Sequence, residues 1–238
     1  MATFVLVHGA WQTASTWDLV TPILEAAGQA VTIPRLTGLE NDPDALSPAI
    51  GLQTHIADVV DHLNRKNLQH VTLVGHSYAG MIITGVAEHA LSRLSQLVYV
   101  DAFIPRDGQS ALDLLPGTIA QMFRQQAAST GEGWRLRGGD GQLDLWGLKP
   151  GPGRDFVRAR LSDFSLRCFE EKVSLPANAA AQLPRTYIAC VADTYPARPI
   201  FQQFGDRARL EHWKYHELLT GHDCHVEMPD AFASKLLT

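Results

Sequence analysis

The stretch VTLVGHSYAG, Val71–Gly80, carries the pattern that decides the fold. Its first four residues form an apolar run that predicts a buried strand, and the residues after it have the apolar spacing of a helix. Ser77 therefore lies on a tight strand-to-helix turn, which exposes its hydroxyl and directs backbone N–H groups and the positive end of the helix dipole toward it. Such a close approach requires small residues. Gly75 and Ala79 supply them, with Ala79 replacing the glycine of the usual G-x-S-x-G pattern and Gly80 directly after it. We expect Ser77 to be a nucleophile.

The composition is that of a globular protein with one large domain, or one domain with an insertion. The chain has 238 residues, of which 45% are hydrophobic, and its net charge is −5. It contains no Lys/Arg run and no apolar stretch of transmembrane length, so nucleic acid and membranes are poor candidates as partners. The first strand-like run begins at Thr3, so we expect no signal peptide. Three widely spaced cysteines, Cys168, Cys190 and Cys224, fit reduced thiols, and we expect a cytoplasmic protein. The oligomeric state stays open, a homodimer included.

Apolar runs and amphipathic segments alternate along the chain. Strands are expected over 4–7, 30–33, 70–74, 97–100, 187–191 and 210–215. Helices are expected over 16–27, 52–63, 81–90 and 199–204 and from residue 230, with a polar, proline-containing loop over 36–48. This repetition predicts an α/β fold with a doubly wound, mostly parallel sheet and right-handed crossovers.

The alternation stops between residues 107 and 183. This stretch is richer in glycine and proline, with short helical pieces around 119–127 and 155–161 and a loop over 147–153. We interpret it as a helical lid inserted into the core, which residues 1–106 and 184–238 then form.

Polar residues that follow the strands are the candidates for catalysis, because ligands bind at the carboxyl ends of the strands in such sheets. Asp193 follows the strand expected over 187–191, and His222 follows the last expected strand. His222 would deprotonate Ser77, and Asp193 would fix the imidazole tautomer. Asp101, at the end of another strand, is the alternative acid, and His225 is a competing base. His76, beside Ser77, is expected to have a structural role.

Four segments resemble one branch of a known family: FVLVHGAW at 4–11, GHSYAG at 75–80, CVADTYP at 190–196 and HDCHVEMP at 222–229. They are similar to the esterase and hydroxynitrile-lyase branch of the α/β-hydrolases, which includes plant methylesterases and related bacterial esterases. The resemblance implies an α/β-hydrolase fold and places the acid at Asp193, three residues after the cysteine. It places the base at His222, seven residues before the proline, and the oxyanion hole at the backbone N–H groups of Ala10 and Tyr78.

The resemblance also separates the two activities of that branch. Similar hydroxynitrile lyases have threonine at the position of Gly9 and a lysine directly after the base, whose charge would stabilise departing cyanide. This chain has Asp223 after the base. We therefore expect a serine esterase that acts on a small hydrophobic ester without a cofactor or metal. A lyase using the same triad and a non-catalytic binding protein remain alternatives.

A metal enzyme is a further rival, since His212 and His216 are four residues apart and the segment 222–225 contains His, Asp, Cys and His. The first pair falls in an expected strand, where this spacing does not form a helical zinc site, and no H-E-x-x-H is present. Aromatic and apolar residues are the candidates for a substrate pocket: Trp11, Tyr78, Phe103, Met122, Phe123, Trp134 and Trp146.

Overall fold

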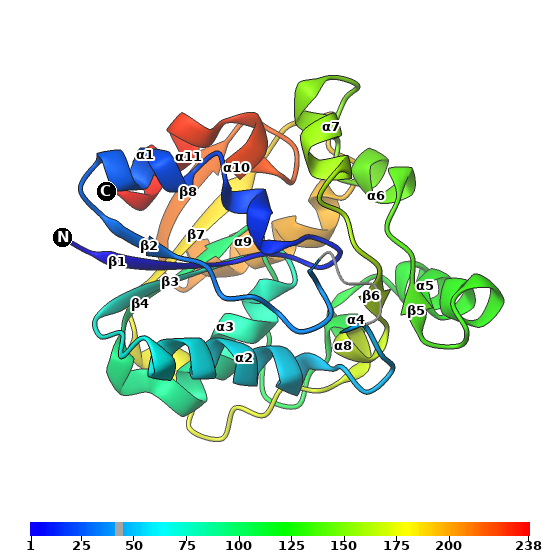
Figure 1. Ribbon diagram of the computed structural model, residues 1–238, viewed down its shortest axis with the longest axis horizontal. Coiled ribbons are helices and arrows are strands. Elements are labelled where there is room, and N and C mark those ends of the chain that lie inside the picture. Colours follow the sequence, from blue (N-terminus) through cyan, green and yellow to red (C-terminus); the bar gives the residue numbers. More distant parts are fainter. Residues whose placement is uncertain (41–44) are drawn as a thin grey trace.

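A parallel sheet of six strands forms the centre of the protein, as the computed structural model of residues 1–40 and 45–238 shows (Figure 1). The order across the sheet is β2-β1-β3-β4-β7-β8, and every neighbouring pair is parallel. The strands are β1 (Thr3–Val7), β2 (Ala30–Thr32), β3 (Val71–His76), β4 (Leu94–Val100), β7 (Arg185–Cys190) and β8 (Lys214–Leu218). The prediction of an α/β fold with a doubly wound parallel sheet is confirmed.

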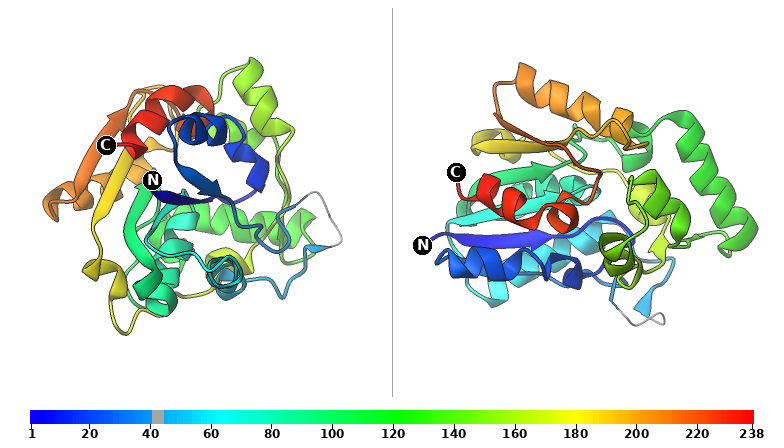
Figure 2. Two further views of the ribbon diagram at one scale, coloured as in Figure 1. Left: turned by 60° about the vertical axis from the view of Figure 1, so that its left-hand side comes forward. Right: turned by 90° about the horizontal axis from the view of Figure 1, so that it is seen from above.

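Helices cover both faces of this sheet (Figures 1 and 2). Helices α1 (Thr21–Ala26) and α11 (Pro229–Leu236) pack together on one face, and α2 (Leu52–Arg65) and α3 (Ala79–Ala90) pack together on the other. Helix α9 (Arg198–Leu210) packs against β7 and β8. Nearly every residue of α3 is buried, which explains its apolar character on all sides. The short elements of this part are η1 (Ala14–Trp17), η3 (Leu91–Arg93) and α10 (Cys224–Glu227).

Most of the chain between β4 and β7 lies beyond the carboxyl ends of the strands, at the right of Figure 1, whereas its last part returns along the core, where η4 (Ala179–Gln182) packs against α3. It contains α4 (Ala111–Leu114), α5 (Gly117–Thr130), β5 (Arg135–Leu136), α6 (Asp140–Leu145), α7 (Pro152–Arg158), β6 (Phe164–Ser165), α8 (Arg167–Glu170) and η4 (Ala179–Gln182). The helical pieces expected around 119–127 and 155–161 correspond to α5 and α7, although α7 ends at Arg158. The antiparallel pair of β5 and β6 was not expected from the sequence.

Two expected elements differ from those observed. The helix expected over 16–27 is a 3₁₀ turn followed by α1, because Pro22 lacks an N–H and is tolerated only in a first turn. The strand expected over 210–215 is instead β8, because α9 continues to Leu210 and the pairing with β7 begins at Lys214. His212 therefore precedes the strand that contains His216. Residues 41–44 of the loop expected over 36–48 lie outside the described residues. In the described part of the chain, no helix is long and apolar enough to span a bilayer.

Candidate active site

Ser77 occupies the turn between β3 and α3 in a left-handed backbone conformation, with φ of 58°. The turn is held by its backbone, since Ser77 N–H donates to Val100 O at 3.0 Å. A Cβ atom on Gly75 would lie 2.8 Å from the Ala79 carbonyl oxygen, and one on Gly80 only 2.0 Å from that of Phe103. Glycine is thus required at 75 and 80, while position 79 accepts a methyl group. A strained φ at a non-glycine residue is characteristic of a functional turn.

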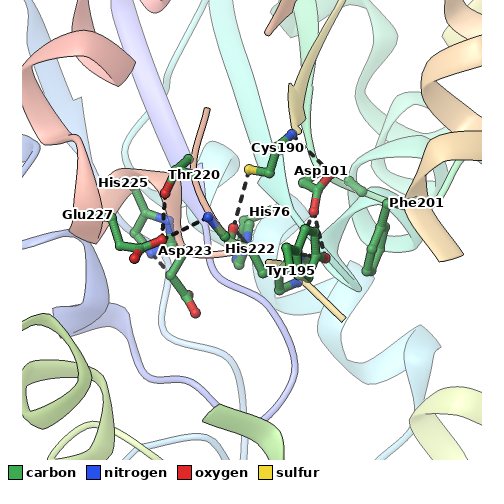
Figure 3. Close-up of polar contacts among 12 residues, drawn as sticks. His76, Asp101, Cys190, Tyr195, Phe201, Thr220, His222, Asp223, His225 and Glu227 are labelled. Atoms are coloured by element: carbon green, nitrogen blue, oxygen red, sulfur yellow. Dashed lines mark hydrogen bonds and ion pairs between the residues drawn. The ribbon is translucent and has the colours of Figure 1, made fainter. Parts of the chain in front are cut away.

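His222 and Asp101 form a buried pair at the carboxyl ends of the strands (Figure 3). Nδ1 of His222 lies 2.7 Å from Oδ2 of Asp101, and the two residues are 1% and 2% exposed. Asp101 directly follows β4 and has a φ of 42°. Its other carboxyl oxygen accepts a hydrogen bond from Cys190 N–H at 3.3 Å. Because a carboxylate only accepts hydrogen bonds, Nδ1 is the protonated nitrogen, and Nε2 keeps its lone pair.

Asp193 does not contact His222, so the prediction that it is the partner of the imidazole is wrong. The Asp193 side chain is 96% exposed and pairs with Arg198 at 2.6 Å. The backbone explains this position. After β7 ends at Cys190, Val191 N–H and Ala192 N–H donate to Leu218 O and Thr220 O, so the chain continues outward beside the end of β8. Asp101, the alternative acid, occupies the position beside His222 that was expected for Asp193.

Burial shifts the acidities of this pair in opposite directions. It raises the pKa of Asp101 to about 7, although hydrogen bonds from Tyr195 and Cys190 oppose this change. It lowers the pKa of His222 to about 3. The imidazole is therefore neutral at neutral pH and able to accept a proton at Nε2. This Nε2 is buried and has no hydrogen-bond partner among the described residues.

The position of His222 is fixed by contacts to its backbone and its ring. His222 N–H donates to Trp146 O at 2.9 Å, and Nε2–H of His76 donates to His222 O at 3.0 Å. The imidazole stacks on the ring of Phe201, with centroids 4.6 Å apart. Trp146 and Phe201 also line the cavity that contains Ser77, which places the imidazole of His222 beside that cavity. The structure shows no hydrogen bond between Nε2 and Ser77 Oγ, a contact that is often long in an enzyme without substrate. His76 has the structural role expected from the sequence.

The backbone of the loop after β1 lies directly against Ser77. A Cβ on Gly9 would be 2.9 Å from Cβ of Ser77, so only glycine allows this approach. Ala10 follows and lines the Ser77 cavity. Neither Ala10 N–H nor Tyr78 N–H donates a hydrogen bond to another described residue. Two N–H groups that belong to neighbours of Ser77 and have no acceptor among the described residues are what an oxyanion hole needs.

A small cavity of about 40 Å³ adjoins Ser77, and its other lining side chains are all apolar. Four of the expected pocket residues line it: Phe123 and Trp146 come from the segment between β4 and β7, and Trp11 and Phe103 come from the loops after β1 and β4. A second cavity of about 480 Å³ lies next to it and shares Trp11, Phe123 and Trp146. We call the cavity beside Ser77 the inner cavity and the larger one the outer cavity.

Three expected pocket residues occupy other positions. Met122 is 51% exposed and lines only the outer cavity. Trp134 lines neither cavity and packs against the guanidinium of Arg135. The side chain of Tyr78 is buried against Phe164. Six further apolar residues line the Ser77 cavity and were not expected from the sequence, because the inward face of the helices that carry all of them but Leu115 was not readable: Leu115, Ile119, Leu145, Phe169, Ile200 and Phe201.

One group of described residues has ligand types suited to a metal ion: His76, Asp223 and His225, all buried. Their candidate ligand atoms lie within 4.8 Å of one another, and Nε2 of His225 is 3.9 Å from Oδ1 of Asp223. Tetrahedral zinc brings ligand atoms to about 3.4 Å from each other. Asp223 already accepts a hydrogen bond from Gln12 at 2.5 Å, and the His225 ring packs 4.5 Å from that of Trp17. The group is thus wider than a zinc site requires, and His225 belongs to the core and not to the cleft.

Comparison with known proteins identifies the family. The model described as the alpha/beta hydrolase family matches residues 4–235. The chain belongs to the α/β-hydrolase family. A carbendazim hydrolyzing esterase of Nocardioides sp. (strain SG-4G) is 34% identical over 249 residues, covering 99% of this chain and 98% of that protein. An alpha-hydroxynitrile lyase of Arabidopsis thaliana is 28% identical over 165 residues, covering 66% and 59%.

The same fold is found in solved structures of this α/β-hydrolase family. An extracellular α/β-hydrolase from a Paenibacillus species superimposes with a TM-score of 0.86 at 24% identity, covering 100% of this chain and 98% of that one. The resemblance inferred from the four sequence segments, to bacterial esterases and to the hydroxynitrile-lyase branch, is confirmed by these relatives.

Proposed function

We propose that the protein is a serine carboxylesterase that cleaves a small hydrophobic ester through an acyl-enzyme on Ser77. One observation carries the proposal: the buried 2.7 Å hydrogen bond between His222 and Asp101, at the same edge of the sheet as the strained Ser77 turn. The similarity to the carbendazim hydrolyzing esterase, which extends over 99% of this chain, supports it.

Each residue of the site has a defined task in this reaction. Nε2 of His222 takes the proton of Ser77 Oγ as the oxygen attacks the ester carbonyl, and Asp101 stabilises the imidazolium that forms. The N–H groups of Ala10 and Tyr78 donate to the oxyanion, each contributing about 3 kcal/mol. The imidazolium then protonates the departing alcohol. Water, activated by the same base, releases the acid and restores Ser77.

The cavities indicate which esters fit. A volume of about 40 Å³ beside Ser77 is about three times the 10–15 Å³ that a cavity needs to hold one water molecule, so it accepts a group of only a few non-hydrogen atoms. One side of the ester bond should therefore be small, such as a methyl or acetyl group. The larger, aromatic side would occupy the outer cavity of about 480 Å³, against Trp11 and Phe123.

A hydroxynitrile lyase with the same residues is the second candidate, since one relative has that activity. Its departing cyanide requires a cation, and the described residues that line the Ser77 cavity are apolar apart from Ser77 itself. Asp223 is turned into the core toward Gln12, so its charge does not face this cavity. The apolar cavity thus favours the esterase.

Two assays test the proposal. The first assay measures hydrolysis of carbendazim and of chromogenic esters with graded acyl and alcohol groups. Esters with a small group on one side of the ester bond should be hydrolysed best. A fluorophosphonate should add its mass to wild type and not to Ser77→Ala. Cyanide release from mandelonitrile without ester turnover would favour the lyase, and no adduct on Ser77 would favour a binding protein.

A further inference from the structure

The hydroxyl of Tyr195 lies within hydrogen-bond distance of both members of the acid–base pair (Figure 3). Tyr195 Oη is 2.8 Å from Oδ2 of Asp101 and 2.9 Å from Nδ1 of His222. These two atoms are themselves 2.7 Å apart. Tyr195 is 2% exposed and comes from the loop after β7, the loop in which the sequence predicted the acid.

The direction of each hydrogen bond follows from the chemistry of the three groups. Oδ2 of Asp101 only accepts, so Tyr195 O–H and His222 Nδ1–H both donate to it. Burial and the charge of Asp101 raise the pKa of Tyr195 well above its usual value, so the phenol stays protonated and remains a donor. With Cys190 N–H on Oδ1, the carboxylate accepts three hydrogen bonds. In the described residues, none of the ion pairs brings a lysine or arginine to Asp101.

We propose that Tyr195 is a positioning residue of the active site, an inference that rests on the proposed esterase function. Its hydroxyl holds Oδ2 of Asp101 at Nδ1 of His222 and keeps the carboxylate ionised where no cation compensates it. The imidazole is thereby held in the tautomer that leaves Nε2 free for Ser77. Tyr195 acts through Asp101 and His222, and it does not line the Ser77 cavity.

The loop geometry supports this role. Tyr195 N–H donates to Ala192 O at 3.2 Å, a turn that reverses the outward course of the chain and returns the side chain to the site. The Tyr195 ring lies nearly parallel to the imidazole, at 27° and 5.7 Å between centroids. The loop that carries Asp193 into solvent thus supplies a buried phenol in its place.

Loss of the phenol hydroxyl should also change the proton affinity of the pair. A hydrogen bond donated to Oδ2 stabilises the Asp101 carboxylate most when no positive charge compensates it, that is, when His222 is neutral. Removing it therefore raises the pH at which the pair takes up a proton. The other titratable groups around the pair stay in place: His76 from β3, Tyr187 and Cys190 from β7, and Asp223.

The test is Tyr195→Phe, which removes only the hydroxyl. We expect kcat to fall about 10- to 100-fold, the cost of a hydrogen bond to a charged group, with KM little changed. The acid limb of the pH profile should move to higher pH. Tyr99→Phe is the matched control, because Tyr99 is equally buried and its hydroxyl bonds only to Thr84 within the described residues. It should leave kcat and the pH profile unchanged.

A second readout does not depend on turnover. The Nδ1 proton of His222 should give a strongly downfield ¹H NMR resonance in wild type and in Ser77→Ala, and Tyr195→Phe should shift it. If wild type hydrolyses no ester but the resonance responds, the proposed function fails and the positioning role stands. A kcat within twofold of wild type with an unmoved resonance would overturn the inference, as would an equal loss of activity in both phenylalanine variants.

Discussion

The loops after β4 and β7 begin at the same edge of the sheet and place their aspartates very differently. Asp101 directly follows β4, is 2% exposed and bonds to His222 at 2.7 Å. Asp193 comes three residues after the end of β7, has a side chain that is 96% exposed and pairs with Arg198. Both are acidic residues after parallel strands, yet only one faces the base.

The difference lies in the backbone hydrogen bonds just beyond each strand. Asp101 N–H still donates to Ile188 O, and a φ of 42° then turns the chain so that the carboxyl faces the neighbouring strand. After β7 the chain continues beside β8 for two residues, which carries Asp193 past the edge. A position at the carboxyl end of a strand is therefore necessary for a catalytic side chain but not sufficient, because the next few peptide groups decide its direction.

Ser77→Ala should cause the largest loss of turnover. Its residual rate is the reference with which the two aspartate variants are compared. We expect turnover to fall about 10⁵- to 10⁶-fold, because no other described group can form the acyl-enzyme in its place. Steady-state hydrolysis of a chromogenic acetate measures this. Thermal unfolding should be unchanged, since the hydroxyl makes no hydrogen bond to the described residues. Activity within tenfold of wild type would remove the basis for a serine mechanism.

The two aspartates should then separate clearly. Asp101→Asn should lower kcat about 10⁴-fold, because the amide can donate to Nδ1 and favours the wrong imidazole tautomer. Asp193→Asn should stay within about threefold, since its carboxylate touches neither His222 nor the cavity. If Asp193→Asn lowered kcat more than Asp101→Asn in the same assay, the loop after β7 would provide the acid during turnover.

The pH dependence of kcat/KM also distinguishes the two aspartates. Catalysis needs ionised Asp101 and neutral His222, and burial raises the pKa of Asp101 to about 7. On acidification the pair takes up a proton, so kcat/KM should decline as the pH falls below about 7. Asp193→Asn should leave this limb in place. A rate independent of pH from 5 to 8 would contradict the buried pair.

The smallest effect concerns stability. The Asp193–Arg198 ion pair lies at the surface, so Arg198→Ala should change the free energy of unfolding by less than about 1 kcal/mol. Urea denaturation measures this. A loss of several kcal/mol would show that the pair anchors the loop, and the exposed position of Asp193 would then be a structural requirement.

Much of the fold was predictable, because it depends on repeated local signals. The alternation of apolar runs and amphipathic segments predicted the parallel sheet, and the Gly75–Gly80 pattern predicted the tight turn at Ser77. The end of α9 at Leu210 was missed, since nothing local separates the helix from the strand that follows. The sequence also predicted that His222 follows the last strand. In the structure its ring lies next to Phe201, which lines the Ser77 cavity.

The acid was not predictable for a physical reason. Both Asp101 and Asp193 satisfy the sequence pattern, and the choice depends on single hydrogen bonds such as Ala192 N–H to Thr220 O. Tyr195 lies in the CVADTYP segment that resembles the family, but nothing in the sequence indicated a role for its phenol. The direction of a side chain after a strand is a tertiary property, which spacing along the chain does not encode.

A crystal structure of the Ser77 phosphonate adduct would show whether Ser77, His222 and Asp101 act together. We expect a phosphoryl oxygen within hydrogen-bond distance of the N–H groups of Ala10 and Tyr78. It also predicts Nε2 of His222 beside Oγ of Ser77, with Nδ1 still on Asp101. An adduct in which His222 has turned to Asp193, or in which the imidazole does not approach Ser77, would contradict it.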